Sequence, residues 1–523
     1  MPDPRATAFS GESHAELMPP ELRHFLSGRT IGTLVVRGAP GVGKTTFALG
    51  ALAAFEGVRT LLTTRVPTET LLQQFPWLGD GSSPPVDLIE FVRFRTISSV
   101  GSLSVDHLRQ TLQARASDLV DVSQVLNLPP IVADHIARQA SGPRLIAIDS
   151  WEAYVENVLG SSTINLDAPT TRWELERGML DQLLATGSSV LLVVERDERS
   201  RFDYIVDGSI LLASQDFDGR EERWLEISKL RGVRIRSRSY PFTLEGARFR
   251  ALMGTSTLVG PPGRADPDPD PSSPDPWPGS AQFAEPFGRL PTGGPMLIET
   301  DTETPARATW RLVLPMVEAT LVAGGRVVVR PPTTLSPSEV WSSFPQLLPS
   351  TELVRSLRIV AAAGAAPPPP DAPPEIVLGA DGPTGAEPTG SDRASDDPAR
   401  EFSPEAARAI EFLGGAPSGR RNLVVVFPSV RADVDPRRGP DEYLRLLGQV
   451  RRDGARFAGI VVMSGEDPLI GSLRGRAPVH LNVRTRRGQI FVFGVRPWSP
   501  SFLLDLSSHR GGRTGPYQLR AMV

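Results

Sequence analysis

The chain has 523 residues, a net charge of −4 and no cysteine, and this length suffices for two or three domains. The balance of 60 acidic against 56 basic residues excludes an overall basic field for nucleic acid or anionic lipid. The lack of cysteine excludes disulfides, thiolate chemistry and cysteine-ligated metal. The sequence shows neither a secretory leader pattern nor an apolar run of about 18 residues, so we expect a cytoplasmic protein.

The first part of the chain alternates strand-like and helical patterns after an N-terminal extension over residues 1–27. Short apolar runs bounded by Gly, Pro or Ser predict buried parallel strands at 32–38, 59–64, 144–149 and 189–195. Helical patterns fall at 44–55, 105–120, 131–139 and 171–185. Shorter strand patterns follow at 224–229 and 248–252. This alternation predicts a three-layer α/β domain over residues 28–258.

Two tracts rich in proline and small or acidic residues interrupt the rest of the chain. Residues 259–287 are predicted to be a Pro/Asp-rich linker, and residues 363–400 a disordered insertion. Strand-like runs return at 296–299, 326–329, 357–361, 422–427, 458–463 and 489–495. We therefore expect a second α/β domain over residues 288–523 that contains the insertion.

Two segments, one in each half, resemble each other. Residues 59–78 read RTLLTTRVPTETLLQQFPWL, and residues 326–347 read RVVVRPPTTLSPSEVWSSFPQL. Both run from an arginine through a strand and a Thr/Pro turn to a short helix and a Phe-Pro pair. This similarity indicates either an internal duplication or two strand-helix units of separate origin that are alike because the same structure requires the same residue pattern.

A glycine-rich loop follows the first predicted strand. It consists of Gly38, Ala39, Pro40, Gly41, Val42, Gly43, Lys44, Thr45 and Thr46, and it matches the pattern GxxxxGK[ST] between a strand and a helix. The glycines allow several backbone N–H groups to face a phosphate, and the helix adds the positive end of its dipole. The sequence therefore predicts an ATP-binding site that includes all nine residues.

Two side chains of this loop and one later carboxylate carry the predicted phosphate and metal chemistry. Lys44 is predicted to reach the β- and γ-phosphates, and Thr45 to bind Mg²⁺. Only two of the 56 basic residues are lysines, Lys44 and Lys229. A lysine in this arginine-rich background indicates a position that needs a compact ammonium group instead of a planar guanidinium group. Asp149 ends the predicted strand LIAID and is the second predicted Mg²⁺ ligand.

The order of these motifs resembles the RecA-superfamily P-loop ATPases of the KaiC, GvpD and RadA type. Besides the phosphate loop, the resemblance rests on LIAIDSWEAY, on FDYIVDGSILL and on Lys229-Leu230-Arg231-Gly232, which is similar to a K-x-R-G element. It covers residues 28–255, with a weaker echo over 288–523. The loop and the segment TTRVPTETLLQQFPWL are most similar to GvpD, a gas-vesicle regulatory family. The resemblance implies that Lys229 and Arg231 contact the γ-phosphate, either of a neighbouring subunit or of the same chain.

One departure from the family bears on catalysis. KaiC-like ATPases carry a Glu pair after the second strand, and the present sequence has Arg65 and Val66 there. Neither is a general base, so we expect slow ATP hydrolysis unless another acid takes the role of the missing Glu. The candidates are Glu69, Glu152 and Glu195. Glu195 ends the fourth predicted strand and is the first candidate for orienting the attacking water.

The second half lacks the phosphate-binding residues. Its first strand is followed by TDTETPAR, which has no glycine or lysine and carries two carboxylates. Phe427 or Pro428 stands where an acid is expected after a later strand. We therefore predict a degenerate RecA-like domain that does not bind nucleotide.

The leading functional hypothesis is an ATP-binding, nucleotide-dependent regulatory switch with weak hydrolysis, which acts on a protein partner or through self-association. A DNA-stimulated ATPase related to recombinases is the alternative, and a KaiC-like autokinase is a third possibility. Arginines alternate along residues 231–238, RGVRIRSR, which are either solvated surface or a contact for an anionic partner.

Overall fold

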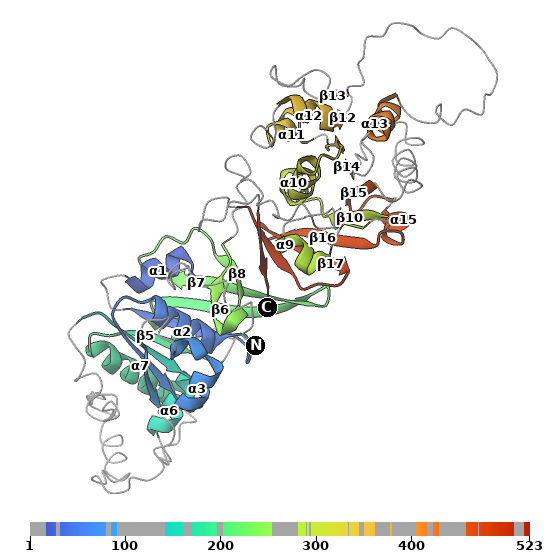
Figure 1. The fold of residues 1–523 in the computed structure, drawn as a ribbon. Coiled ribbons are helices and arrows are strands. Elements are labelled where there is room, and N and C mark those ends of the chain that lie inside the picture. Colours follow the sequence, from blue (N-terminus) through green and yellow to red (C-terminus); the bar gives the residue numbers. More distant parts are fainter. Residues whose placement is uncertain are drawn as a thin grey trace, which may run out of the picture. The chain divides into compact units, whose positions relative to one another are not determined.

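The computed structural model describes residues 17–27, 32–79, 85–90, 142–159, 169–195, 202–253, 281–288, 290–291, 294–332, 334–344, 350–360, 377–378, 404–415, 422–427, 457–468, 470–506 and 517–522. The chain forms two compact units, Met1–Met253 with Met522–Val523 and Gly254–Ala521 (Figure 1). The helices expected at 105–120 and 131–139 and most of the linker lie outside the described residues. In the described part, no helix combines the length and apolarity needed to cross a membrane.

The first unit is built on a nine-stranded sheet in the order β3-β2-β4-β5-β1-β6-β7-β8-β9. The strands from β3 to β6 in this order are parallel, and β6 to β9 form an antiparallel extension. Their bounds are β1 Thr33–Arg37, β2 Val58–Thr63, β3 Asp87–Glu90, β4 Arg144–Asp149, β5 Ser189–Val193, β6 Gly208–Phe217, β7 Arg220–Leu230, β8 Ser239–Thr243 and β9 Arg250–Ala251.

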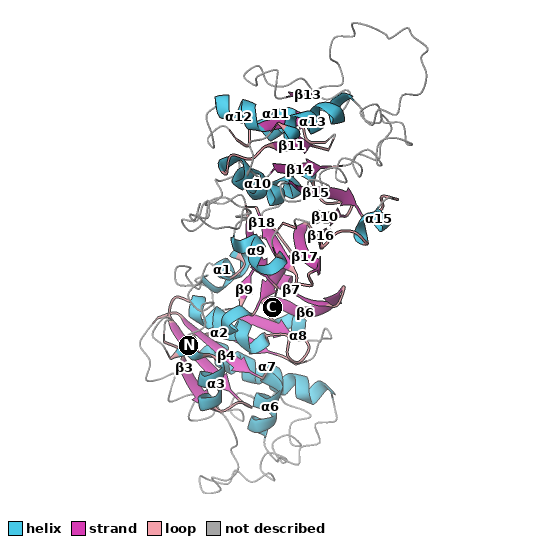
Figure 2. Cartoon of the chain, turned by 45° about the vertical axis from the view of Figure 1, so that its right-hand side comes forward, coloured by secondary structure: helices cyan, strands magenta, loops and turns pink. Residues whose placement is uncertain are grey.

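Helices cover both faces of this sheet, because the central strands are apolar on both sides (Figure 2). One face packs against the helices α1 Pro20–Ser27, α2 Lys44–Ala54 and α3 Thr68–Gln74, with the 3₁₀ turn η3 Pro76–Leu78. The other face packs against α6 Trp151–Leu159 and α7 Pro169–Ala185. The short helix α8 Phe202–Ile205 precedes β6, and the 3₁₀ turn η5 Glu245–Ala247 follows β8. The predicted three-layer α/β architecture is confirmed.

The N-terminal boundary differs from the expected one, because residues 17–27 belong to the first core. Met18 and Leu22 are buried in the same cluster as Leu34 of β1. Glu21 is also buried, and its carboxylate accepts hydrogen bonds from the Tyr240 hydroxyl at 2.6 Å and from the backbone N–H groups of Arg236 at 3.0 Å and Ser237 at 3.2 Å. Helix α1 is therefore an integral part of the domain rather than an extension.

The second unit contains a ten-stranded sheet in the order β13-β12-β11-β14-β15-β10-β16-β17-β18-β19. Its strands are β10 Pro295–Thr300, β11 Val327–Arg330, β12 Leu357–Val360, β13 Val377–Leu378, β14 Asn422–Val426, β15 Phe457–Ser464, β16 Val479–Arg486, β17 Gln489–Arg496, β18 Phe502–Asp505 and β19 Gln518–Ala521. The helices are α9 Ala281–Phe287, α10 Ala306–Val322, α11 Pro337–Trp341, α12 Ser350–Ser356, α13 Pro404–Gly414 and α15 Ile470–Arg474.

Two of these elements correct the sequence-based boundaries. Residues 281–287 were predicted to be linker but form α9, whose Phe283 and Phe287 are buried in the second core. Val377–Leu378 falls within the predicted insertion but pairs with β12 as a parallel edge strand. In both places apolar residues interrupt a polar, proline-rich background, and the composition of the whole tract hides them.

The two sheets share one topology. If β13 is set aside, the order β12-β11-β14-β15-β10-β16-β17-β18-β19 repeats the order of the first sheet strand for strand, and the strands also follow the same order along the chain. The switch from parallel to antiparallel pairing falls at the same place, after β6 in one sheet and after β16 in the other. This match favours an internal duplication and makes β10 the counterpart of β1.

Candidate functional site

The phosphate loop joins β1 to the first turn of α2. Gly38, Gly41 and Gly43 all have positive φ angles, of 150°, 81° and 104°. A Cβ atom on Gly38 would lie 2.3 Å from the Leu212 carbonyl oxygen, so the loop needs glycine there for space as well as for conformation. Helix α2 begins without a side-chain cap, which leaves its first backbone N–H groups available to an anion.

Lys44 and Thr45 occupy the first turn of α2. The Lys44 ammonium is largely buried and donates hydrogen bonds to the carbonyl oxygens of Gly38 at 2.5 Å and Ala39 at 3.0 Å. Its charge therefore lies within the loop that is predicted to hold the phosphates. Thr45 Oγ1 donates a hydrogen bond to Asp149 Oδ2 at 2.5 Å, which places the two predicted Mg²⁺ ligands together.

Three charged side chains gather at the carboxyl ends of adjacent parallel strands. Asp149 ends β4, which lies between β2 and β5, while Arg65 follows β2 and Glu195 follows β5. The guanidinium of Arg65 forms an ion pair with the carboxylate of Glu195. Since the pair joins residues that flank β4, it spans the strand that ends in Asp149. Sequence reasoning named Arg65 and Glu195 separately and missed this pairing, because 130 residues separate them.

The surroundings of Asp149 act in opposite directions on its pKa. Burial raises the pKa of this carboxyl, while the Thr45 hydrogen bond and the Lys44 charge lower it. The Glu195 charge raises the pKa and the Arg65 charge lowers it, and the net direction is upward. A bound divalent cation would act in the opposite direction to burial, because its charge favours the ionised form of the carboxyl.

The donor set at this position fits Mg²⁺. Thr45 and Asp149 supply oxygen atoms, which this hard cation prefers. The hydroxyl of the next residue, Ser150, is buried and has no hydrogen-bond partner within the described part of the chain, so it is a further polar group to consider at this site. Sequence reasoning assigned no role to Ser150, although its place directly after a strand-end acid was a usable signal.

The other two candidate bases have different environments. Glu152 accepts a hydrogen bond from the Glu195 backbone N–H at 3.1 Å and so helps to fix the backbone of Glu195. Glu69 lies exposed in the first turn of α3. Glu195 is the acid that the structure places in direct contact with Arg65, beside Asp149.

Lys229 and Arg231 lie near the amino-terminal ends of the central strands, at the opposite end of these strands from the phosphate loop. Lys229 pairs with Ser209 at the start of β6, and this end of β6 lies beside the start of β1. The phosphate loop follows the end of β1, so the two lysines are separated by the length of that strand. Lys229 Nζ donates to the Val206 carbonyl at 2.6 Å, and Arg231 forms a 3.1 Å ion pair with Asp207. A contact of either residue with the phosphates bound by the same chain is inconsistent with this placement.

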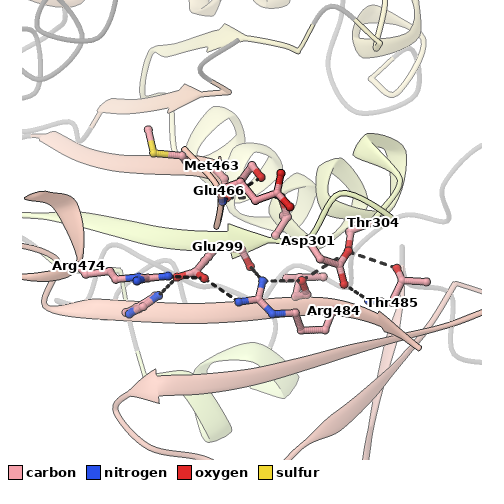
Figure 3. A network of polar contacts seen from close by, with 12 residues as sticks. Glu299, Asp301, Thr304, Met463, Glu466, Arg474, Arg484 and Thr485 are labelled. Carbon is pink, nitrogen blue, oxygen red and sulfur yellow. Dashed lines mark hydrogen bonds and ion pairs between the residues drawn. The ribbon is translucent and has the colours of Figure 1, made fainter. Parts of the chain in front are cut away.

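In the second unit, an ion-pair network lies at the carboxyl end of β10, the position that corresponds to the phosphate loop of the first unit (Figure 3). Glu299 of β10 is buried and accepts hydrogen bonds from Arg474, Arg484 and His480 at 2.7, 2.7 and 3.1 Å. Asp301 accepts bonds from Thr304 Oγ1 at 2.5 Å and from the Thr485 backbone N–H at 2.7 Å.

This network stabilises the charged form of a buried acid at the position where the first unit has its phosphate loop. Burial alone would raise the pKa of Glu299, yet the hydrogen bonds from His480, Arg474 and Arg484 lower it well below its usual range. At the end of β14, the counterpart of β4, Val426 and Phe427 are buried where the first unit has Asp149. Among the described residues of either unit, no group of three or more His, Asp or Glu side chains forms a metal cluster.

The fold and the loop together define the class of protein. A glycine-rich phosphate loop joins the central strand of a parallel sheet to the next helix, and an acid ends a nearby strand. This is a P-loop protein with a RecA-like first domain, as the sequence predicted. Residues 22–228 match the family described as GvpD gas vesicle protein, P-loop domain.

Two relatives from one organism agree with this match. Protein GvpD2 of Halobacterium salinarum is 31% identical over 239 residues, which are 45% of this chain and 44% of the relative. Protein GvpD1 of the same organism is 30% identical over 249 residues, which are 46% and 42% of the two chains. The chain thus spans less than half the length of these relatives. A KaiC-like protein of Pyrococcus horikoshii has a solved structure that is 18% identical, with a TM-score of 0.27, over 42% of this chain and 89% of that one.

Proposed function

We propose that this protein is a cytoplasmic ATP-binding regulator of the GvpD kind. Its first unit would bind Mg-ATP, and the bound nucleotide would change the surface that the protein offers to a partner or to a second copy of itself. By analogy with the relatives' name, the regulated process would be gas-vesicle formation. The observation that carries the proposal is the placement of Lys44, Thr45 and Asp149 around one phosphate loop.

Each residue has a separate task in this proposal. Lys44 would leave the loop carbonyls for the β- and γ-phosphates, while the α2 N-terminus holds the phosphate oxygens. Thr45 and Asp149 would hold Mg²⁺, which neutralises phosphate charge. Glu195 would orient water for slow hydrolysis. The second unit would contribute structure or a partner surface, since its loop presents the carboxylates Asp301 and Glu303.

The test is a titration of the purified full chain with ATP and with ADP in the presence of Mg²⁺. The Lys44→Ala variant should lose nucleotide affinity by at least tenfold, because the charge that faces the phosphates is gone. Arg177→Ala is the matched control, since Arg177 lies on α7, is exposed, and forms an i,i+4 ion pair with Asp181. Unchanged affinity in Lys44→Ala would refute the site. Circular dichroism of both variants would establish that they fold.

Lys229 and Arg231 remain a separate proposal, now confined to contact with nucleotide on a neighbouring subunit. In that case Lys229→Ala would reduce turnover of the assembled protein while nucleotide binding to a single chain stays the same. Turnover measured over a range of protein concentrations tests this assignment, since a contact between subunits gains effect as subunits associate.

A DNA-stimulated ATPase is the second candidate, and one feature favours it. Arg231, Arg234, Arg236 and Arg238 are all exposed, and Glu21 fixes the backbone between them. Steady-state ATP turnover with and without single-stranded or double-stranded DNA separates the two candidates. Slow turnover indifferent to DNA supports the regulator, whereas strong stimulation that falls steeply with salt supports the DNA-dependent enzyme.

A further inference from the structure

Arg65 occupies a fixed position at the nucleotide edge of the first sheet. Thr63 Oγ1 donates to the Val66 carbonyl at 2.6 Å and closes the turn that contains Arg65. The backbone N–H and the hydroxyl of Thr64 both donate to the Asp149 carbonyl at 2.9 Å. The backbone on both sides of Arg65 is therefore held, and it is held to the residue that ends β4.

The side chain of Arg65 has more freedom than its backbone. It is half exposed, and its partner Glu195 is about one-third exposed, at 50% and 38% of their side-chain surfaces. An ion pair with this much contact to water contributes little to stability, so exchanging one partner for another costs little. A terminal phosphate carries more charge than one carboxylate, and its oxygens match the two-pronged guanidinium.

The Arg65–Glu195 pair lies close to Asp149, because its two residues follow β2 and β5, the strands on either side of β4. Lys44, Glu195 and Arg65 all act on this carboxyl by their charges. Adjacent strands are about 4.8 Å apart, so the arginine on β2 and the acid on β5 approach each other over a distance of two strand spacings. Both groups are thus within side-chain reach of the end of β4, where the distal phosphates and their cation would lie.

We infer that Arg65 selects the triphosphate form of the nucleotide by exchanging Glu195 for the γ-phosphate. In the absence of that phosphate the ion pair holds Glu195; when the phosphate is present, Arg65 binds it and Glu195 is released to orient water. The residue that replaces the usual acid after β2 thus becomes a specificity-determining residue. This inference rests on the proposed nucleotide site.

The experiment compares affinities for the non-hydrolysable triphosphate AMP-PNP and for ADP, both with Mg²⁺, in the full chain. Arg65→Ala should weaken AMP-PNP binding by roughly ten- to a hundredfold, the range of a hydrogen bond between charged groups. Its ADP affinity should change by less than about twofold, and retained ADP binding also shows that the variant is folded. Glu195→Gln should tighten AMP-PNP binding roughly threefold or more without affecting ADP, because Arg65 no longer has a charged competitor.

Arg65→Lys and Arg177→Ala complete the set. Lysine keeps the charge but not the fork, so it should recover only part of the preference for triphosphate. Arg177→Ala removes an equally exposed arginine and should leave both affinities unchanged. An unchanged ratio of the two affinities in Arg65→Ala, or an equal loss of both, would overturn the inference. The wild type binding neither nucleotide, or Lys44→Ala binding both normally, would instead refute the nucleotide site itself.

Discussion

Thr45 Oγ1 donates a 2.5 Å hydrogen bond to Asp149 Oδ2 and so links the start of α2 to the end of β4. The two residues are 104 positions apart in the chain. The bond brings the hydroxyl of the phosphate loop to an acid whose pKa is raised by burial. Thr45 and Asp149 would hold a divalent cation through these two oxygens, and its charge would favour the ionised form of the carboxyl.

Asp149→Asn should make the nucleotide-free protein more stable and abolish the effect of Mg²⁺ on ATP binding. A raised folded-state pKa means that the ionised carboxylate costs stability, a cost that grows as pH rises from about 4 through the raised pKa. The amide keeps an oxygen for Thr45 and carries no charge. Urea unfolding should show a larger gain at pH 8 than at pH 5. Asp181→Asn, on the exposed face of α7, should show no such gain.

Gly38→Ala should cost more stability than Gly41→Ala. At position 38 a new Cβ would meet a backbone oxygen at 2.3 Å, and the expected loss is about 2 kcal/mol or more. At position 41 nothing lies within 4 Å, so only the left-handed conformation opposes the change, at about 1 kcal/mol. Chemical denaturation of the two variants measures the difference. Equal losses would show that the loop moves away from β6 without cost.

Glu299→Gln should destabilise the second unit by about 3–5 kcal/mol at neutral pH, the usual result of breaking a buried ion pair. Because the folded-state pKa of Glu299 is lowered, its contribution is present above its ordinary value of 4.5 and is lost as pH falls below it. The variant should therefore lose less stability than the wild type on going from pH 5 to pH 3. Glu303→Gln, in the exposed loop after β10, is the matched control. Parallel pH profiles for wild type and Glu299→Gln would contradict this account.

Glu21→Ala should destabilise the first unit by about 2 kcal/mol, because it leaves the buried Tyr240 hydroxyl and two backbone N–H groups without their acceptor. Tyr240→Phe removes one of these donors. A double-mutant cycle should give a coupling of about 1 kcal/mol or more between the two positions. Additive losses would mean that α1 is held by its apolar side chains alone.

The sequence predicted those parts of the fold and site that depend on neighbouring residues. The phosphate loop is one such part, since the glycines, Lys44 and Thr45 act within one turn. The strands β1, β2, β4 and β5 were predicted because they are short apolar runs with clear breaks. Contacts between distant residues were not predictable in this way: Arg65 with Glu195, and Glu21 with Tyr240, form only after the sheet brings their elements together. Helix α1 was missed because eight residues give too short a periodic pattern.

The two units have separate cores, and only the first has a phosphate loop. A ligand stabilises only the folded state that binds it, so ATP bound at the proposed site would raise the melting temperature of the first unit. In the second unit, by contrast, the charge of Glu299 is balanced by side chains of the same chain and does not depend on a bound ligand. Nucleotide at the proposed site would therefore also protect the first unit from proteases, because it lowers the population of the unfolded form that they cleave.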